Sequence, residues 1–237
     1  MVRSIAMPGD FDAEVIRTDF DRLALLSGDG WDHNSHYANS LLKYIPADCK
    51  SALEIGCGTG AFARLLAKRA ERVLALDLSP KMIQIARERS QKYANIDYQV
   101  DNVLEWEFPV EQFDCVASIA TLHHLPMEEM LAKMKSTLKV NGTLMVLDLF
   151  QGEGLPDVLR SALAVLVSTT LKLIKTGRVR PSRAEREAWA EHGQRDAYLT
   201  LSEVHGICAD TLPGAQVRKH LLWRYSIVWK KAAKSPG

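Results

Sequence analysis

Short apolar runs alternate with stretches of helical periodicity through the middle of this chain. The apolar runs predict five buried strands, at residues 51–55, 72–77, 96–100, 115–119 and 143–149. Between them, apolar residues recur at the spacing of amphipathic helices over 61–70, 80–92 and 127–138. Strands that alternate with helices imply a parallel sheet covered by helices on both faces, so we predict an α/β protein.

The flanking regions predict further elements. Helical periodicity covers residues 10–26, ended by Ser27–Gly30, and residues 35–45, stopped by Pro46. Asn141-Gly142 is predicted to be a turn before the fifth strand. After that strand we expect a long apolar helix over 156–173 and a helix from Thr200 to about Thr211. Two strands at 216–222 and 225–230, joined by a tight turn around Trp223 and Arg224, complete the chain.

Composition limits the classes of function. The 237 residues are enough for one large domain with its own core, and 47% apolar and 25% charged residues are ordinary for a soluble globular chain. A net charge of +1 gives no general attraction to nucleic acid or to an acidic membrane. The four cysteines form no CxxC pair, the first residues lack a signal-peptide pattern, and the apolar run at 162–167 is too short to span a bilayer. We therefore expect a cytoplasmic protein.

The first predicted strand leads directly into a glycine loop. Gly56, Gly58 and Gly60 alternate between Glu54-Ile55 and the helix that begins at Ala61. Glycines suit a tight turn in which a ligand touches the backbone, because a Cβ would collide with that ligand. The spacing from Gly56 to Ala61 also satisfies the dinucleotide fingerprint, so the pattern alone leaves an NAD(P)-dependent oxidoreductase open.

The second strand ends in an acid, Asp77, at about the interval after the glycine loop that is typical of a ribose-binding residue. A carboxylate accepts hydrogen bonds from both hydroxyls of a vicinal diol. Ser79 followed by Pro80 is the better start for the next helix, so Asp77 is predicted to be free for a ligand. Asp148, near the end of the fifth strand, is expected at the same carboxyl edge of the sheet.

Three segments resemble a known family. Glu54–Gly60 resembles the signature loop of class I S-adenosylmethionine-dependent methyltransferases, and Asp77–Met82 and Phe113–Pro126 resemble two further family motifs, the last as it occurs in small-molecule enzymes of the ubiquinone and menaquinone type. The resemblance implies a Rossmann-like seven-stranded sheet of order 3-2-1-4-5-7-6 with strand 7 antiparallel. It also implies one domain over 1–237: an N-terminal helical cap (1–46), a cofactor-binding core (47–150), a lid insertion (151–199), and a final helix and hairpin (200–237).

The same resemblance implies S-adenosyl-L-methionine as cofactor, with S-adenosyl-L-homocysteine as product. Glu54 and the backbone of the glycine loop would hold the methionine part, and Asp77 the ribose. Leu78 and Met82 would flank the adenine, and Asp101 with the following backbone would meet its edge, although Asp and Asn are also ordinary turn residues. The full set of expected cofactor contacts is Tyr37, Glu54, Gly56, Cys57, Gly58, Gly60, Asp77, Leu78, Met82, Asp101, Asn102, Val103, Ile119 and Ala120.

Three side chains are candidates on the methyl-acceptor side: His123, His124 and Tyr37. The two histidines follow the fourth strand, where the family places the transferable methyl group, and imidazole titrates near neutral pH. Of the pair, His124 is favoured, while the alternative is a histidine that merely enters a helix. For Tyr37 the alternative is an amphipathic residue at the domain edge. His33 and His36 have metal-ligand spacing without a third ligand nearby, so no metal is expected.

The acceptor is predicted to be a small molecule. The residues Ile119-Ala-Thr-Leu122 differ from the Asn-Pro-Pro-Tyr or Asp-Pro-Pro-Tyr of nucleobase N-methyltransferases, which argues against DNA. A basic run over 172–186 leaves open a tRNA or protein methyltransferase, or an anionic membrane surface, although nearby acids dilute its charge. A non-catalytic cofactor-binding module also stays open. The sequence distinguishes neither O-, N- and C-methylation nor the oligomeric state.

Overall fold

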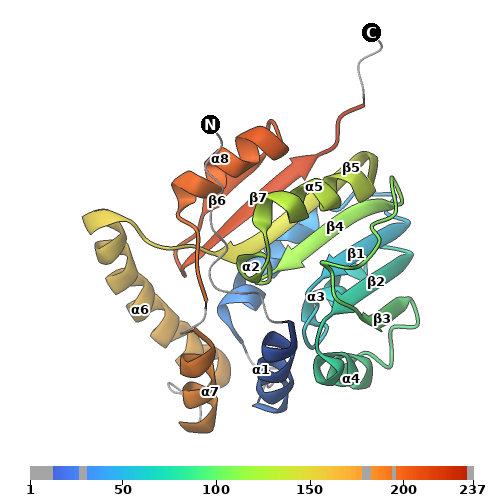
Figure 1. Ribbon diagram of the computed structural model, residues 1–237. Helices are drawn as coiled ribbons and strands as arrows, with labels where there is room; N and C mark the ends of the chain where they lie inside the picture. The colour runs from blue at the N-terminus through green and yellow to red at the C-terminus, as the bar shows by residue number, and fades with distance from the viewer. Residues whose placement is uncertain (1–12, 27–30, 178–182, 194–195, 234–237) are drawn as a thin grey trace.

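The computed structural model describes residues 13–26, 31–177, 183–193 and 196–233. Seven strands form one sheet of order β3-β2-β1-β4-β5-β7-β6 (Figure 1). Their bounds are β1 Ser51–Ile55, β2 Arg72–Asp77, β3 Ile96–Val100, β4 Phe113–Ile119, β5 Leu138–Leu149, β6 Gln216–Lys219 and β7 Arg224–Lys230. β1 to β5 pair in parallel, and β7 pairs antiparallel with both β5 and β6. The predicted fold class and strand order are confirmed.

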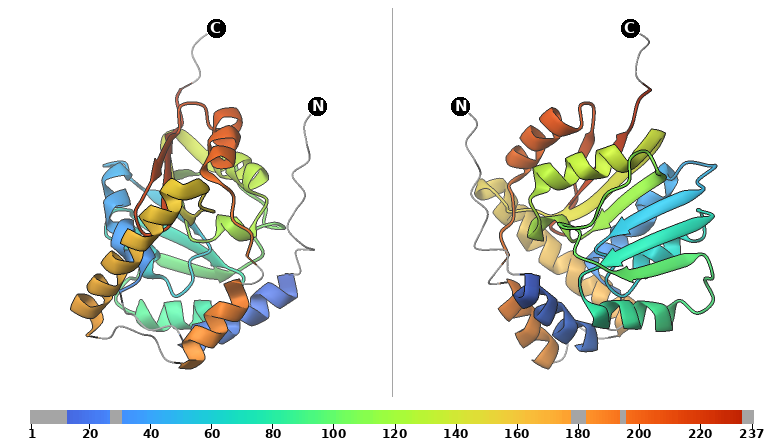
Figure 2. Two further views of the ribbon diagram at one scale, coloured as in Figure 1. Left: turned by 90° about the vertical axis from the view of Figure 1, so that its left-hand side faces the viewer. Right: turned by 45° about the vertical axis from the view of Figure 1, so that its right-hand side comes forward.

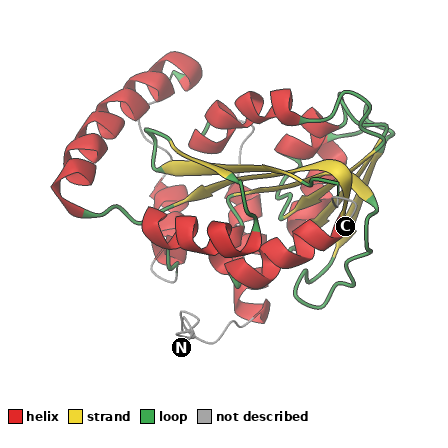
Figure 3. Cartoon of the chain, turned by 90° about the horizontal axis from the view of Figure 1, so that it is seen from above, coloured by secondary structure: helices red, strands yellow, loops and turns green. Residues whose placement is uncertain are grey.

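Helices cover both faces of the sheet, which Figure 3 shows edge-on between the two layers. The helices α2 (His33–Leu41), α3 (Ala61–Leu66) and α4 (Pro80–Arg89) pack on one face, and α5 (Met127–Thr137) and α8 (Leu201–Thr211) on the other. Side chains of β1 alternate between these layers: Leu53 and Ile55 join the core beneath α5 and α8, and Ala52 joins the core beneath α2 to α4. The period of two in the apolar runs thus produces two cores.

The helix starts follow from their capping residues. Ser79 Oγ accepts a hydrogen bond from the Met82 amide at 3.0 Å, and Pro80 occupies the first turn of α4, as predicted. Asp32 and Ser35 form a capping box that starts α2 at His33, two residues before the predicted start, and the short 3₁₀ helix η1 (Leu42–Tyr44) follows. The predicted helix end at Ser27–Gly30 lies outside the described residues.

Asn141-Gly142 does not separate two elements. β5 begins at Leu138, directly after α5, and the pairing partner of β4 jumps from Leu138 to Thr143. Asn141 adopts φ +64° inside this irregularity, so the turn residues form a bulge within a longer strand. β6 likewise ends at Lys219 rather than residue 222, because the chain already turns toward Trp223, which has φ +52°.

Three further helices gather beyond the carboxyl ends of the parallel strands (Figures 1 and 2). They are α1 (Ala13–Leu26), α6 (Gly154–Thr176) and α7 (Arg183–Gly193). α1 packs against α4 and α7, and a small core of Leu23, Ala24, Met82 and Ala188 joins them. Among the described residues, no helix combines the length and the apolar character needed to cross a membrane.

Candidate active site

The glycine loop after β1 has one open position. Gly56, Gly58 and Gly60 all have positive φ, at +70°, +50° and +76°. A Cβ on Gly56 would lie 2.1 Å from the Thr121 hydroxyl, and one on Gly60 would lie 2.3 Å from the Tyr98 hydroxyl. A Cβ on Gly58 would meet nothing within 4 Å. Packing therefore requires glycine at the two outer positions, whereas Gly58 leaves its backbone open to a ligand.

Glu54 is a buried carboxylate with an unused oxygen. Its side chain lies at the end of β1, the residue is 1% exposed, and Oε2 has no hydrogen-bond partner. Burial and the neighbouring Asp77 raise the pKa of Glu54 well above its ordinary value, against the opposing effects of Arg64 and the Ala63 amide. A buried, unpartnered acceptor beside an open glycine is well suited to a ligand that carries a cation.

Asp77 ties the glycine loop to the end of β2. Its Oδ2 accepts from the Gly58 amide at 2.7 Å and its Oδ1 from the Ser79 amide at 2.9 Å. Burial raises the pKa of Asp77 to about 6, although both amide hydrogen bonds oppose this shift. The sequence predicted that this carboxylate is free for a ligand, but both of its oxygens already accept hydrogen bonds from backbone amides. Each oxygen still has a second lone pair, so it can also accept from a diol.

Of the other residues expected at the cofactor, Asp101 lies beside Asp77, whereas Asn102, Val103 and Met82 make contacts elsewhere. Asp101 follows β3 and its amide donates to the Asp77 carbonyl at 2.9 Å, which places it beside the ribose candidate. The side chain of Asn102 makes a local contact, because its Oδ1 accepts from the Leu104 amide at 3.1 Å. This contact is typical of a turn residue, the alternative role that the sequence left open for Asn102. Val103 and Met82 are buried in cores, Met82 against α1, while Leu78 is half-buried. Met82 therefore presents little surface to a ligand.

The loop after β4 lies against the glycine loop. Ala120 adopts φ +51°, unusual for a residue with a Cβ, and its amide donates to the Leu147 carbonyl at 2.7 Å. The Thr121 hydroxyl lies 3.3 Å from the Gly56 carbonyl and 3.1 Å from the Ile119 carbonyl. Backbone strain of this kind is often found at ligand sites, and here it brings the end of β4 next to the backbone that follows Glu54.

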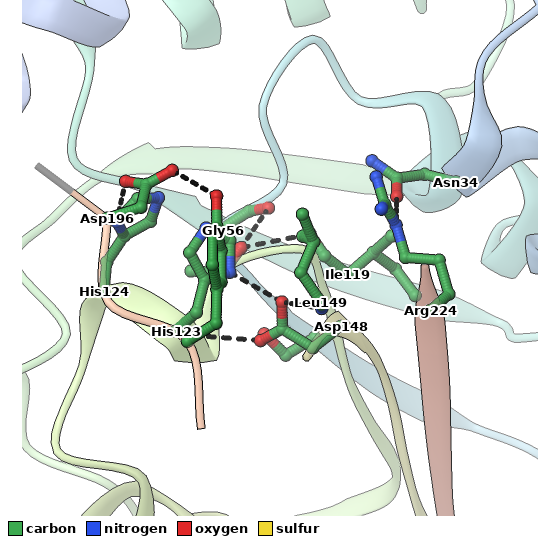
Figure 4. Close-up of polar contacts among 12 residues, drawn as sticks. Asn34, Gly56, Ile119, His123, His124, Asp148, Leu149, Asp196 and Arg224 are labelled. Atoms are coloured by element: carbon green, nitrogen blue, oxygen red, sulfur yellow. Dashed lines mark hydrogen bonds and ion pairs between the residues drawn. The ribbon is translucent and has the colours of Figure 1, made fainter. Parts of the chain in front are cut away.

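The structure places His123 and His124 side by side at this loop, with ring centroids 3.9 Å apart (Figure 4). Asp148, at the end of β5, accepts from the His123 amide at 3.0 Å and lies 2.6 Å from Nδ1 of the same residue. Burial disfavours the charged imidazole of His123, but Asp148 outweighs it and the pKa is raised. Burial, together with His123 and His192, lowers the pKa of His124 to about 2. His124 is therefore neutral at physiological pH and a weak base.

Several polar residues complete this region without having been singled out from the sequence. Nδ1 of His124 lies 3.4 Å from Oδ1 of Asp196, and Nε2 of His192 lies 3.7 Å from the same oxygen. Tyr198 donates its hydroxyl to Oδ2 of Asp196 at 2.6 Å. Arg224, which starts β7, is nearly buried and donates to Asn34 of α2 at 2.7 Å. No linear pattern links these positions to the histidine pair, since they are distant in sequence.

Tyr37 is not among the residues that contact the histidine pair. Its hydroxyl accepts from the Leu222 amide at 3.1 Å, and its ring stacks on His220 with centroids 4.6 Å apart. The N-terminal helix α2 is thereby held to the chain between β6 and β7. His33 and His36 of the same helix pack against Trp31.

Comparisons with known proteins agree with this geometry. Residues 52–142 match the family model of a methyltransferase domain. An uncharacterized methyltransferase of Mycobacterium tuberculosis is 28% identical over 204 residues, which cover 84% of this chain and 96% of the relative. A ubiquinone biosynthesis O-methyltransferase of Xanthomonas campestris is 32% identical over 144 residues, or 54% of this chain and 59% of the relative.

A solved structure shares the fold. Phosphoethanolamine N-methyltransferase 2 of Haemonchus contortus, in complex with phosphomonomethylethanolamine and S-adenosylhomocysteine, superposes with a TM-score of 0.65 at 17% identity. The match covers 98% of this chain and 62% of that chain. The sheet order and the glycine loop define the class as a Rossmann-like methyltransferase fold. The chain carries the methyltransferase domain and is an S-adenosylmethionine-dependent methyltransferase.

Proposed function

We propose that this enzyme methylates a small-molecule acceptor by direct transfer, with a quinone-related compound as the first class to test. The observation that carries the proposal is the enclosure of the histidine pair. The side chains of His123, His124 and Asp196 are only 7%, 10% and 6% exposed. Such a closed site suits a small acceptor better than a folded RNA or protein. The names of curated quinone methyltransferases among the relatives support the acceptor class.

The residues around the glycine loop fit the cofactor. The unpartnered Oε2 of Glu54 would accept from the ammonium of its methionine part, and the open backbone at Gly58 would lie against it. Asp77 would accept from the ribose hydroxyls, and Asp101 would meet the adenine. When bound, S-adenosylmethionine supplies an electrophilic methyl carbon.

On the acceptor side, the chain positions the nucleophile and excludes water. Ile119 and Ala120 would border the cofactor, and His123 and His124 would face the acceptor from the next turn of chain, the 3₁₀ helix η2 (Leu122–His124). Asp148 fixes the ring of His123 through Nδ1, so Nε2 is the ring nitrogen left to face the acceptor side. Holding the reactants in line within a closed site accounts for much of the barrier reduction in reactions of this type. We further propose that α6 and α7, which lie between β5 and α8 in the chain, act as the lid.

The test is a methyl-transfer assay that detects S-adenosylhomocysteine with a panel of demethylated quinone precursors, bulk tRNA and a protein extract. We expect turnover with a member of the first group, and loss of turnover in His124→Ala and His123→Ala with cofactor affinity retained. His205→Ala, on the exposed side of α8, is the matched control. Turnover confined to tRNA or protein would overturn the acceptor class. A chain that binds cofactor but never forms product with any acceptor would overturn catalysis.

A further inference from the structure

The polar cluster at the acceptor side has the geometry of a metal centre. His123, His124 and Asp196 each offer one ligand atom, and these three atoms lie within 4.8 Å of one another. The residues come from separate parts of the fold, η2 after β4 and the segment that follows α7, and Figure 4 shows them converging. We propose that His123, His124 and Asp196 bind a divalent transition metal, with Zn²⁺ as the best match to this nitrogen and oxygen donor set.

The first argument is spacing. Nδ1 of His124 lies 3.4 Å from Oδ1 of Asp196, longer than an ordinary hydrogen bond. Two ligands of one tetrahedral zinc ion, each at about 2.0–2.2 Å, are about 3.3–3.6 Å apart. This pair therefore has the separation that a shared ion would set, and the ligand atom of His123 lies within 4.8 Å of both.

The second argument is that, in two of the three ligands, the polar atom that would not bind the metal already has a hydrogen-bond partner. Nδ1 of His123 is bound by Asp148 at 2.6 Å, which leaves Nε2 as its ligand atom. Oδ2 of Asp196 accepts from Tyr198 at 2.6 Å, which leaves Oδ1. Metal-binding histidines commonly donate their second nitrogen to a carboxylate, and metal-binding carboxylates are themselves hydrogen-bonded.

Three protein ligands leave one position of a tetrahedral ion open, as in zinc sites that bind a substrate. An acceptor hydroxyl at that position would lose its proton to solvent more readily, because the cation stabilises the anion. The identity of this fourth ligand rests on the proposed function, whereas the metal site itself does not. The site would also join the segment after α7 to the loop after β4, so metal binding should stabilise the fold.

The test uses the tag-free full chain after removal of metal with EDTA. Titration with Co²⁺ should give the visible absorption bands of four-coordinate cobalt at one equivalent, Zn²⁺ should displace them, and either metal should raise the melting temperature. Asp196→Asn, which keeps the side-chain shape, and His124→Ala should abolish the bands. Tyr198→Phe, which removes only the hydrogen bond to Oδ2, should weaken binding about 10–100-fold. His205→Ala should bind as the wild type does.

Two outcomes would overturn the proposal: no cobalt bands at micromolar to millimolar metal, or bands of equal strength in the wild type and in folded Asp196→Asn. Calorimetry with S-adenosylhomocysteine on the same samples separates the two proposals. Absence of the cobalt bands in a chain that still binds S-adenosylhomocysteine would remove the metal site and leave the proposed function intact.

Discussion

Glu54→Gln separates the role of this residue in the cofactor site from its role in the fold. The substitution keeps the size of the side chain and removes the negative charge from a site that is 1% exposed. If Oε2 accepts from the ammonium of the cofactor, the variant loses one charge-assisted hydrogen bond in a buried site. Such bonds contribute about 1.5–3 kcal/mol, which corresponds to an affinity for S-adenosylmethionine weakened about 10–150-fold.

The same variant should change the stability of the cofactor-free protein in the opposite direction. Because the pKa of Glu54 is raised in the folded state, the native protein binds more protons than the unfolded chain above pH 4.5. The wild type therefore loses stability as the pH rises from this value through the raised pKa. Glu54→Gln removes that loss, so its unfolding midpoint in urea should exceed that of the wild type at pH 8, with a smaller difference at pH 5.

The assay pairs calorimetry with urea unfolding on both proteins. Weaker cofactor binding in a variant that is at least as stable as the wild type at pH 8 is the expected result, since a merely damaged fold would lower both quantities. Wild-type affinity in Glu54→Gln would refute the assignment of Glu54 to the cofactor.

Three other substitutions test the site and its frame. Asp77→Ala should weaken cofactor binding more than tenfold in calorimetry, about 1.4 kcal/mol or more, and wild-type affinity in the folded variant would disprove its role. Gly60→Ala should lower the free energy of unfolding by about 1–3 kcal/mol from backbone strain at φ +76° alone, whereas Gly206→Ala, within α8 with open space around it, should not destabilise. Equal stability of the two variants would contradict the packing argument. Asp148→Asn should lower the pKa of His123, followed by NMR titration of the ring: in the wild type this pair stabilises the fold at low pH, and the contribution fades as the pH rises through the raised pKa of His123. An unchanged titration would contradict the pairing.

The sheet was predictable because its signals are local. The break from β1 into the glycine loop and the capping of α4 by Ser79 each depend on residues within a few positions of one another. The strand order followed from the family resemblance. The Asn141-Gly142 bulge was not predictable, because the same dipeptide ends a strand or bulges within one depending on the partner strand.

The site was predictable only where it follows a strand end. Glu54 and Asp77 lie at the ends of β1 and β2, and the histidine pair lies in the loop after β4, so the topology places them at one edge of the sheet. The meeting of His124 with Asp196, and of Tyr37 with the chain before β7, depends on how α1, α2 and α7 pack. Nothing in the local pattern fixes that packing, so Asp196, the third ligand of the proposed metal site, emerged only from the structure. The unpartnered oxygen of Glu54 also emerged only from the structure, because hydrogen-bond partners are not visible in a sequence.

The most direct measurement is a calorimetric titration of the wild-type chain with S-adenosylmethionine, S-adenosylhomocysteine and NAD in parallel. We predict micromolar binding of both adenosyl compounds with one equivalent per chain, and none for NAD. Binding of NAD alone would contradict the account, because the glycine loop and Glu54 would then hold a dinucleotide.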